Sequence, residues 1–94
     1  MDSGLLPGPF RYRAPVLEQL WRHGIQPTPR TRPDLVREFV RDLYKFEIRT
    51  LKGRMLRGAF PRREYAQRVE QLRGRYAILA LLPWQLVEQD GPPS

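Results

Sequence analysis

The sequence contains no cysteine, and this absence excludes three kinds of chemistry. The protein forms no disulfide bond, has no thiol nucleophile and cannot hold a metal through thiolates. Histidine is nearly absent too, since His23 is the only one, and no carboxylates stand beside it at the spacing of metal ligands. We therefore expect no metal site and no cofactor. We interpret His23 as a residue that meets free carbonyl groups at the C-terminal end of a helix.

Serine is almost as scarce, because it occurs only at Ser3 and Ser94, close to the chain ends. A catalytic nucleophile must be held against its base, and terminal segments do not hold it. Gly53 and Gly58 have the glycine spacing of a phosphate loop, but the lysine and hydroxyl residue that should follow are missing. The sequence thus predicts no catalytic residue, no small-molecule substrate and no enzymatic activity.

Long apolar runs are missing as well. The longest covers residues 76–82 and ends at Pro83, far short of the roughly 20 residues that cross a membrane. The first 13 residues lack the basic-then-apolar layout of a signal peptide. We expect a soluble, cytoplasmic protein that does not insert into membranes.

Positive charge is what the chain has in excess. Seventeen basic residues, mostly arginine, stand against ten acidic residues and give a net charge of +7. The excess lies in residues 30–75, which hold 14 basic and six acidic residues. Such a charge favours an acidic partner, either a protein or a nucleic acid. The arginine excess itself has two interpretations that stay open: bidentate recognition of carboxylate or phosphate, and compositional bias.

Apolar periodicity predicts an all-α fold. Residues 31–57 spread apolar side chains over about 220° of a helical circumference, which is wide enough to contact two neighbours. We expect Thr31 to be the N-cap of this helix. Residues 61–82 place apolar side chains at alternating steps of four and three, the spacing of two helices packed nearly antiparallel. We expect this second helix to continue through Gly74.

A shorter helix is predicted over residues 15–23. Pro15 suits its first turn, and Gly24 suits the residue after its end. The predicted fold is an antiparallel helical hairpin, about 31–57 against 61–82, with the short helix packed across it.

The domain prediction follows from these helices. One small helical domain covers residues 14–88, a flexible arm covers residues 1–13, and a disordered tail covers residues 89–94. Within the arm, Phe10 and Tyr12 are expected to dock on the domain rather than on a partner.

Glu47 lies inside the apolar face of the 31–57 helix. A buried carboxylate needs a charged or hydrogen-bonding partner. We predict a structural buried pair with Arg54, two turns further on, or with an arginine of the second helix. A catalytic acid and a socket for a partner's cation are the alternatives.

Two sets of basic residues are candidates for a binding surface. One set steps by four along the 31–57 helix and has acidic neighbours at pairing distance, which predicts a self-paired, solvated face; it comprises Arg37, Arg41, Lys45 and Arg49. The other set has only Glu64 and Glu70 nearby, which favours it as a footprint for phosphate; it comprises Arg62, Arg63, Arg68, Arg73 and Arg75.

These features predict a non-catalytic interaction module, such as an adaptor, assembly or accessory subunit, that binds an acidic protein surface. Self-association is a second kind of protein contact, because so small a hairpin leaves apolar surface over. The alternative function is sequence-tolerant binding of RNA or DNA through the second set of arginines. No zinc finger, helix-turn-helix or RNA-binding fingerprint accompanies these arginines.

Overall fold

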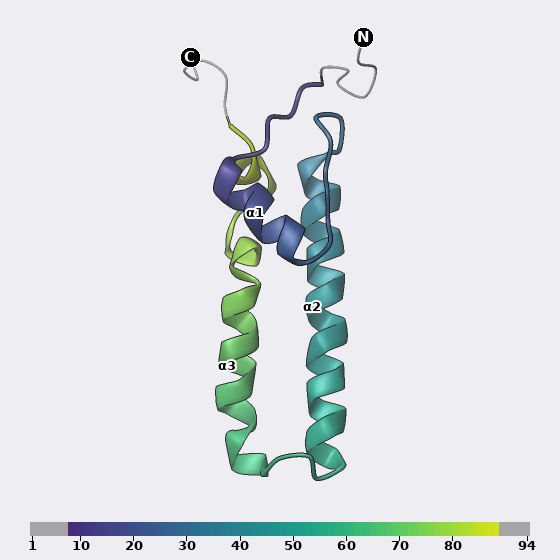
Figure 1. The fold of residues 1–94 in the computed structure, drawn as a ribbon, viewed down its shortest axis with the longest axis vertical. Coiled ribbons are helices and arrows are strands. Elements are labelled where there is room, and N and C mark those ends of the chain that lie inside the picture. The colour runs from purple at the N-terminus through teal and green to yellow at the C-terminus, as the bar shows by residue number, and fades with distance from the viewer. Residues whose placement is uncertain (1–7, 89–94) are drawn as a thin grey trace.

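The computed structural model describes residues 8–88, and this part of the chain is all-α, which confirms the predicted fold class (Figure 1). Three α-helices account for most of it: α1 spans Ala14–Arg22, α2 spans Pro33–Leu56 and α3 spans Tyr65–Arg75. Three short 3-10 helices follow α2: η2 at Arg62–Glu64, η3 at Ala77–Ala80 and η4 at Pro83–Leu86.

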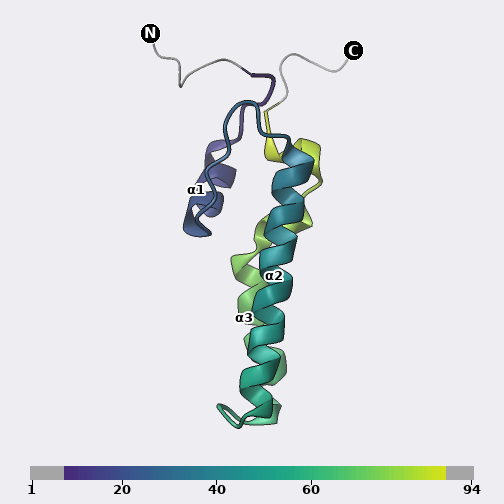
Figure 2. The same ribbon diagram turned by 90° about the vertical axis from the view of Figure 1, so that its right-hand side faces the viewer.

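Helices α2 and α3 lie side by side and are joined by a short turn at one end of the molecule (Figure 1). Helix α1 covers one face of this pair, but only at the end away from the turn (Figure 2). The 3-10 helices η3 and η4 pack against α2 at the same end. The molecule is therefore two layers thick at one end, where α1 covers the pair, and a single layer of two helices at the other (Figures 1 and 2).

The hydrophobic core follows this arrangement. Most buried apolar side chains come from α1, from the first half of α2 and from η3 and η4. Toward the turn, burial is reduced to Leu72 and Phe60. The fully buried residues of the core are Leu20, Val40, Ile78 and Leu86.

Helix α1 ends as predicted. Gly24 has a φ of 78°, and the backbone N–H of Ile25 donates to the Leu20 carbonyl at 2.8 Å. Ile25 is buried, as expected of an apolar residue that packs back on such a helix end. Trp21 is the exception among the large apolar side chains of α1, because it is 55% exposed.

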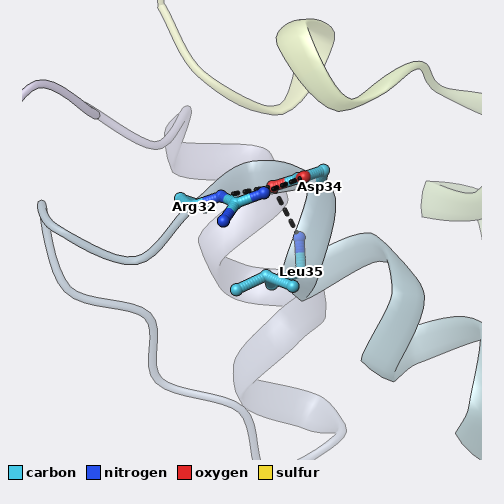
Figure 3. A network of polar contacts seen from close by, with 3 residues as sticks. All are labelled: Arg32, Asp34 and Leu35. Atoms are coloured by element: carbon cyan, nitrogen blue, oxygen red, sulfur yellow. Dashed lines mark hydrogen bonds and ion pairs between the residues drawn. The ribbon is translucent and has the colours of Figure 1, made fainter.

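Helix α2 begins one residue later than predicted, at Pro33, so its N-cap is Arg32 rather than Thr31. Pro33 takes the first helical position, where its missing N–H leaves nothing unpaired. Asp34 accepts the Leu35 N–H at 2.9 Å and pairs with Arg32 at 2.7 Å (Figure 3). The hydrogen bond from Arg32 lowers the pKa of the Asp34 carboxyl. The Thr31 hydroxyl instead accepts a backbone N–H within the preceding loop.

The prediction of one helix over residues 61–82 is wrong beyond Arg75. Helix α3 ends at Arg75, directly after Gly74, and Tyr76 has φ −116° and ψ 39°. In a continuing α-helix the Arg75 carbonyl would accept the Leu79 N–H. That N–H donates to the Tyr76 carbonyl instead, at 2.9 Å, and the chain goes on as the 3-10 helix η3.

Within the arm predicted over residues 1–13, Phe10 and Tyr12 dock on the domain, as predicted. Tyr12 is buried, its hydroxyl donates to the Thr31 carbonyl at 2.5 Å, and it forms an isolated backbone bridge with Val87. Residues 1–7 of the arm, and the tail predicted over residues 89–94, lie outside the described residues.

The burial of Tyr12 predicts loss of stability at alkaline pH. Burial, and secondarily the negative charge of Asp34, raise the pKa of Tyr12 to about 12. The unfolded chain releases this proton near pH 10, whereas the folded chain keeps it until about pH 12. The free energy of unfolding should therefore fall between these pH values, by at most about 1.4 kcal/mol per pH unit.

Urea unfolding between pH 9 and 12 measures this slope. In Tyr12→Phe the slope should be shallower, while stability at neutral pH drops by about 1 kcal/mol because the hydrogen bond to Thr31 is lost. An unchanged slope in Tyr12→Phe would show that other groups control alkaline unfolding.

Candidate binding groove

Helices α2 and α3 leave a groove of about 490 Å³ between them. Its apolar lining consists of Leu43, Phe46 and Leu51 from α2 and Leu72 from α3. Three arginines, one carboxylate and two uncharged polar side chains surround this lining: Arg54, Arg68, Arg75, Glu47, Thr50 and Gln71. We call this site the groove.

Helical spacing explains why these residues meet. On α2 the groove residues Leu43, Phe46, Thr50 and Arg54 follow each other at steps of three and four, so they share one flank of the helix. On α3 the same steps separate the groove residues Arg68, Gln71 and Arg75. The two flanks face each other only because the chain reverses between them.

Arg68 is held in place by its neighbours. Its guanidinium lies 4.2 Å from the centre of the Phe60 ring and pairs with Glu64 at 3.1 Å. Its Nε is buried and has no hydrogen-bond partner among the described residues, which costs about 1–3 kcal/mol. The cation–π contact offsets part of this cost.

The other two groove arginines are unpaired. Within residues 8–88, neither Arg54 nor Arg75 forms an ion pair, and both are exposed. With Arg68 they set three positive charges against the single carboxylate of Glu47. The groove is therefore a positively charged site with an apolar lining.

The structural buried pair predicted for Glu47 and Arg54 is wrong. Glu47 is only half-buried, and its carboxylate accepts a hydrogen bond from the Tyr76 hydroxyl. Burial first, then this hydrogen bond and the charge of Glu47, raise the pKa of Tyr76. A signal was available in the sequence, because Tyr76 lies on a seam that is expected to be buried and a buried tyrosine hydroxyl needs a partner.

Tyr76 also joins the groove to α1. Its ring stacks on His23 with the ring centres 4.3 Å apart, and Tyr44 meets its edge at 5.3 Å. Nε2 of His23 lies 2.9 Å from the Arg75 carbonyl oxygen. The histidine thus meets a free helix-end carbonyl as predicted, but that carbonyl belongs to α3 rather than to its own helix.

The five arginines of the second set do not form one surface. Arg73 lies about 140–160° around α3 from Arg68 and Arg75, at 100° per residue. It pairs with Glu70 at 2.8 Å, and a hydrogen bond with the Tyr44 side chain raises its pKa. The remaining two, Arg62 and Arg63, are exposed in η2, and neither forms an ion pair with another described residue.

The basic residues of the set on α2 also differ in their contacts. Arg37 donates to the carbonyl groups of Leu81 and Leu79, at 2.6 and 2.8 Å, so it holds η3 on α2. Of the predicted surface pairs, only the one between Arg41 and Glu38 is present, at 3.8 Å. The last two members, Lys45 and Arg49, are exposed and form no ion pair within residues 8–88.

The basic residues of α2 other than Arg54 point away from the groove. Lys45 is about 160° around the helix from Glu47, at 100° per residue. A ligand in the groove therefore does not reach Lys45. The exposed basic residues of this outer side of α2 are Arg41, Lys45, Arg49 and Lys52.

Residues 8–88 contain no group of three or more histidine, aspartate and glutamate side chains that could hold a metal ion. No helix in the same range is both long enough and apolar enough to cross a membrane. The chain matches no protein-family model, no curated protein and no solved structure.

Proposed function

We propose that this protein is a non-catalytic interaction module that binds an acidic protein surface in the groove. One observation carries the proposal: an apolar lining that includes the exposed ring of Phe46 is flanked by three arginines, and Arg54 and Arg75 have no acidic partner within residues 8–88. Arginine and aromatic residues are enriched where proteins meet. A partner that supplies carboxylates and apolar side chains satisfies both parts of the groove.

The apolar lining and the arginines of the groove contribute unequally to the free energy of binding. Phe46 is 61% exposed, and covering the exposed part of a phenylalanine, on the order of 100 Å², contributes about 2–3 kcal/mol. An exposed ion pair contributes only about 0.2–1 kcal/mol. The apolar lining thus supplies most of the affinity, and the arginines select an acidic partner.

RNA or DNA binding is the second candidate. Arg62 and Arg63 support it, because they are exposed beside the turn and form no ion pair with a described residue. Phosphate binding needs no apolar lining, however, and the second set of arginines points in several directions. Such binding would weaken steeply with salt.

Reversal of the groove charges tests the proposal. The groove variant is Arg54→Glu/Arg68→Glu/Arg75→Glu, and the matched control is Arg41→Glu/Lys45→Glu/Arg49→Glu, which changes the net charge equally on the outer side of α2. Each variant serves as bait in the cytoplasmic fraction of the native host, the compartment that the absence of cysteine favours.

We expect the wild type and the control to retain the same acidic protein. The groove variant should retain about tenfold less of it, which corresponds to a loss of about 1.4 kcal/mol in binding free energy. Thermal melting of both variants is the control for folding. Retention of nuclease-sensitive material, lost on reversal of Arg62, Arg63 and Arg68, would favour the second candidate. Equal retention by the groove variant and the control would exclude the groove as the site.

A further inference from the structure

Building on the proposed function, we infer that the occupant of the groove is a single amphipathic α-helix of a partner protein. This helix is about three turns long and carries acidic residues along both edges of its apolar face. Three observations support this helix: α1 covers the same layer, the groove has the length of a short helix, and its charges lie at helical spacing.

Helix α1 shows what covers this face of the molecule. It lies on the α2–α3 pair and buries Val16 and Leu20 there (Figure 2). Along its edge is a hollow that Glu18, Arg22 and His23 line from the α1 side. Glu47 and Arg75 line both this hollow and the groove. The groove is therefore the continuation of a surface that the protein itself covers with an amphipathic helix.

The dimensions of the groove fit a second helix. From Leu43 to Arg54 the α2 side rises by about 16 Å, or three helical turns. Helices that dock in grooves do so through apolar anchors at helical spacing. An added β-strand would need a free sheet edge, and the described residues contain no sheet.

The charges predict where the acidic residues of the partner stand. Arg68 and Arg75 are seven residues apart on one flank of α3, so they are separated by about 10.5 Å along the helix. Two carboxylates at positions i and i+7 of an adjacent helix have the same separation and face the same side. Arg54, on α2, donates to a carboxylate on the opposite edge of that helix.

Glu47 does not cancel this preference, because its single negative charge stands against the three positive charges of the groove arginines. The partner helix therefore has apolar residues at heptad positions a and d and acidic residues at e and g.

A second copy of this chain does not meet the requirement. Residues 30–75 hold 14 basic and six acidic residues, so a second copy would bring more positive charge to the groove. Like charges brought together oppose such an association. Charge complementarity therefore assigns the groove to a different, acidic chain.

Two synthetic peptides of the same composition test the inference with the full-length protein. Both have apolar residues at a and d over about one and a half heptads, which is the three turns that the groove accommodates. The patterned peptide carries glutamate at e and g, and the control peptide carries those glutamates at b, c and f. Fluorescence anisotropy measures the affinity of each, and circular dichroism measures the helix gained on binding.

The patterned peptide should bind at least about tenfold more tightly than the control peptide and gain helix on binding. Its affinity should fall about tenfold for Arg68→Glu/Arg75→Glu. It should stay within about twofold for the matched variant Arg41→Glu/Arg49→Glu, whose charges lie on the outer side of α2.

The remaining outcomes separate the two proposals. If both peptides bind equally and both weaken for Arg68→Glu/Arg75→Glu, the groove binds acidic segments but the helical occupant is wrong. Binding of the patterned peptide without a gain of helix overturns the helical occupant in the same way. If Arg68→Glu/Arg75→Glu and Arg41→Glu/Arg49→Glu change the affinity for both peptides equally, the proposed function is wrong as well.

Discussion

Truncation of Leu20 to alanine is expected to lower the free energy of unfolding by about 2–5 kcal/mol. Leu20 has no exposed surface and packs in the core where α1 meets α2, η3 and η4. The surrounding side chains can only partly close the cavity that alanine leaves, so the loss exceeds the transfer free energy of the deleted atoms. In a domain of this size, each kcal/mol lowers the melting temperature by about 4–8 °C.

Leu56 provides the matched control. It is the last residue of α2 and is 61% exposed, so Leu56→Ala deletes the same atoms without opening a cavity and should cost less than about 1 kcal/mol. Urea unfolding of the two variants measures the difference. If Leu20→Ala were as stable as Leu56→Ala, α1 would be a loosely docked helix rather than part of the core, and α1 could not serve as the example of how this face is covered.

The parts of the fold that the sequence predicts well depend on local rules. The end of α1 follows from Gly24, which adopts a positive φ, and from the apolar Ile25 behind it. The end of α2 has the same form, since Gly58 has a φ of 82°. Proline at the start of α1 and α2 likewise follows a local preference.

The end of α3 could not be predicted from the apolar pattern. The apolar spacing continues from Leu72 through Tyr76 to Leu79 without a shift. At the end of the helix the Tyr76 ring stacks on His23, and Nε2 of His23 meets the Arg75 carbonyl, which a continuing helix would use itself. These partners are more than 50 residues apart in the sequence, and periodicity contains no information about them.

The wide apolar face of α2 shows a second limit of periodicity. A pattern shows that a residue is suited to burial, but not whether the covering element belongs to the same chain. Val36 and Val40 are covered by this chain, whereas Leu35, Phe39 and Phe46 are about half exposed or more. The exposed part leads into the groove at Phe46, and the groove itself depends on how α2 and α3 are aligned, which no single helix reveals.

Replacing Arg37 by alanine is expected to lower the free energy of unfolding by about 2–3 kcal/mol, since hydrogen bonds to a charged group are stronger than neutral ones. Its guanidinium donates to two carbonyl groups, those of Leu81 and Leu79, and so ties the end of η3 to α2. Arg41, one turn further on, is its matched control. The 3.8 Å pair of Arg41 with Glu38 is exposed, so Arg41→Ala should change stability by less than about 0.5 kcal/mol.

Arg37→Lys separates charge from geometry. The planar guanidinium reaches both carbonyl oxygens at once, whereas an ammonium group is a point charge that replaces only one of these contacts well. We expect Arg37→Lys to lose about half as much stability as Arg37→Ala. Thermal and urea unfolding of the three variants provide the measurement. Equal stability of Arg37→Ala and Arg41→Ala would contradict the role of Arg37 in holding η3 on α2. A larger loss for Arg37→Ala is expected, because only Arg37 reaches the chain that returns after α3. The spacing of the two arginines along α2 does not reveal this difference in their contribution to stability.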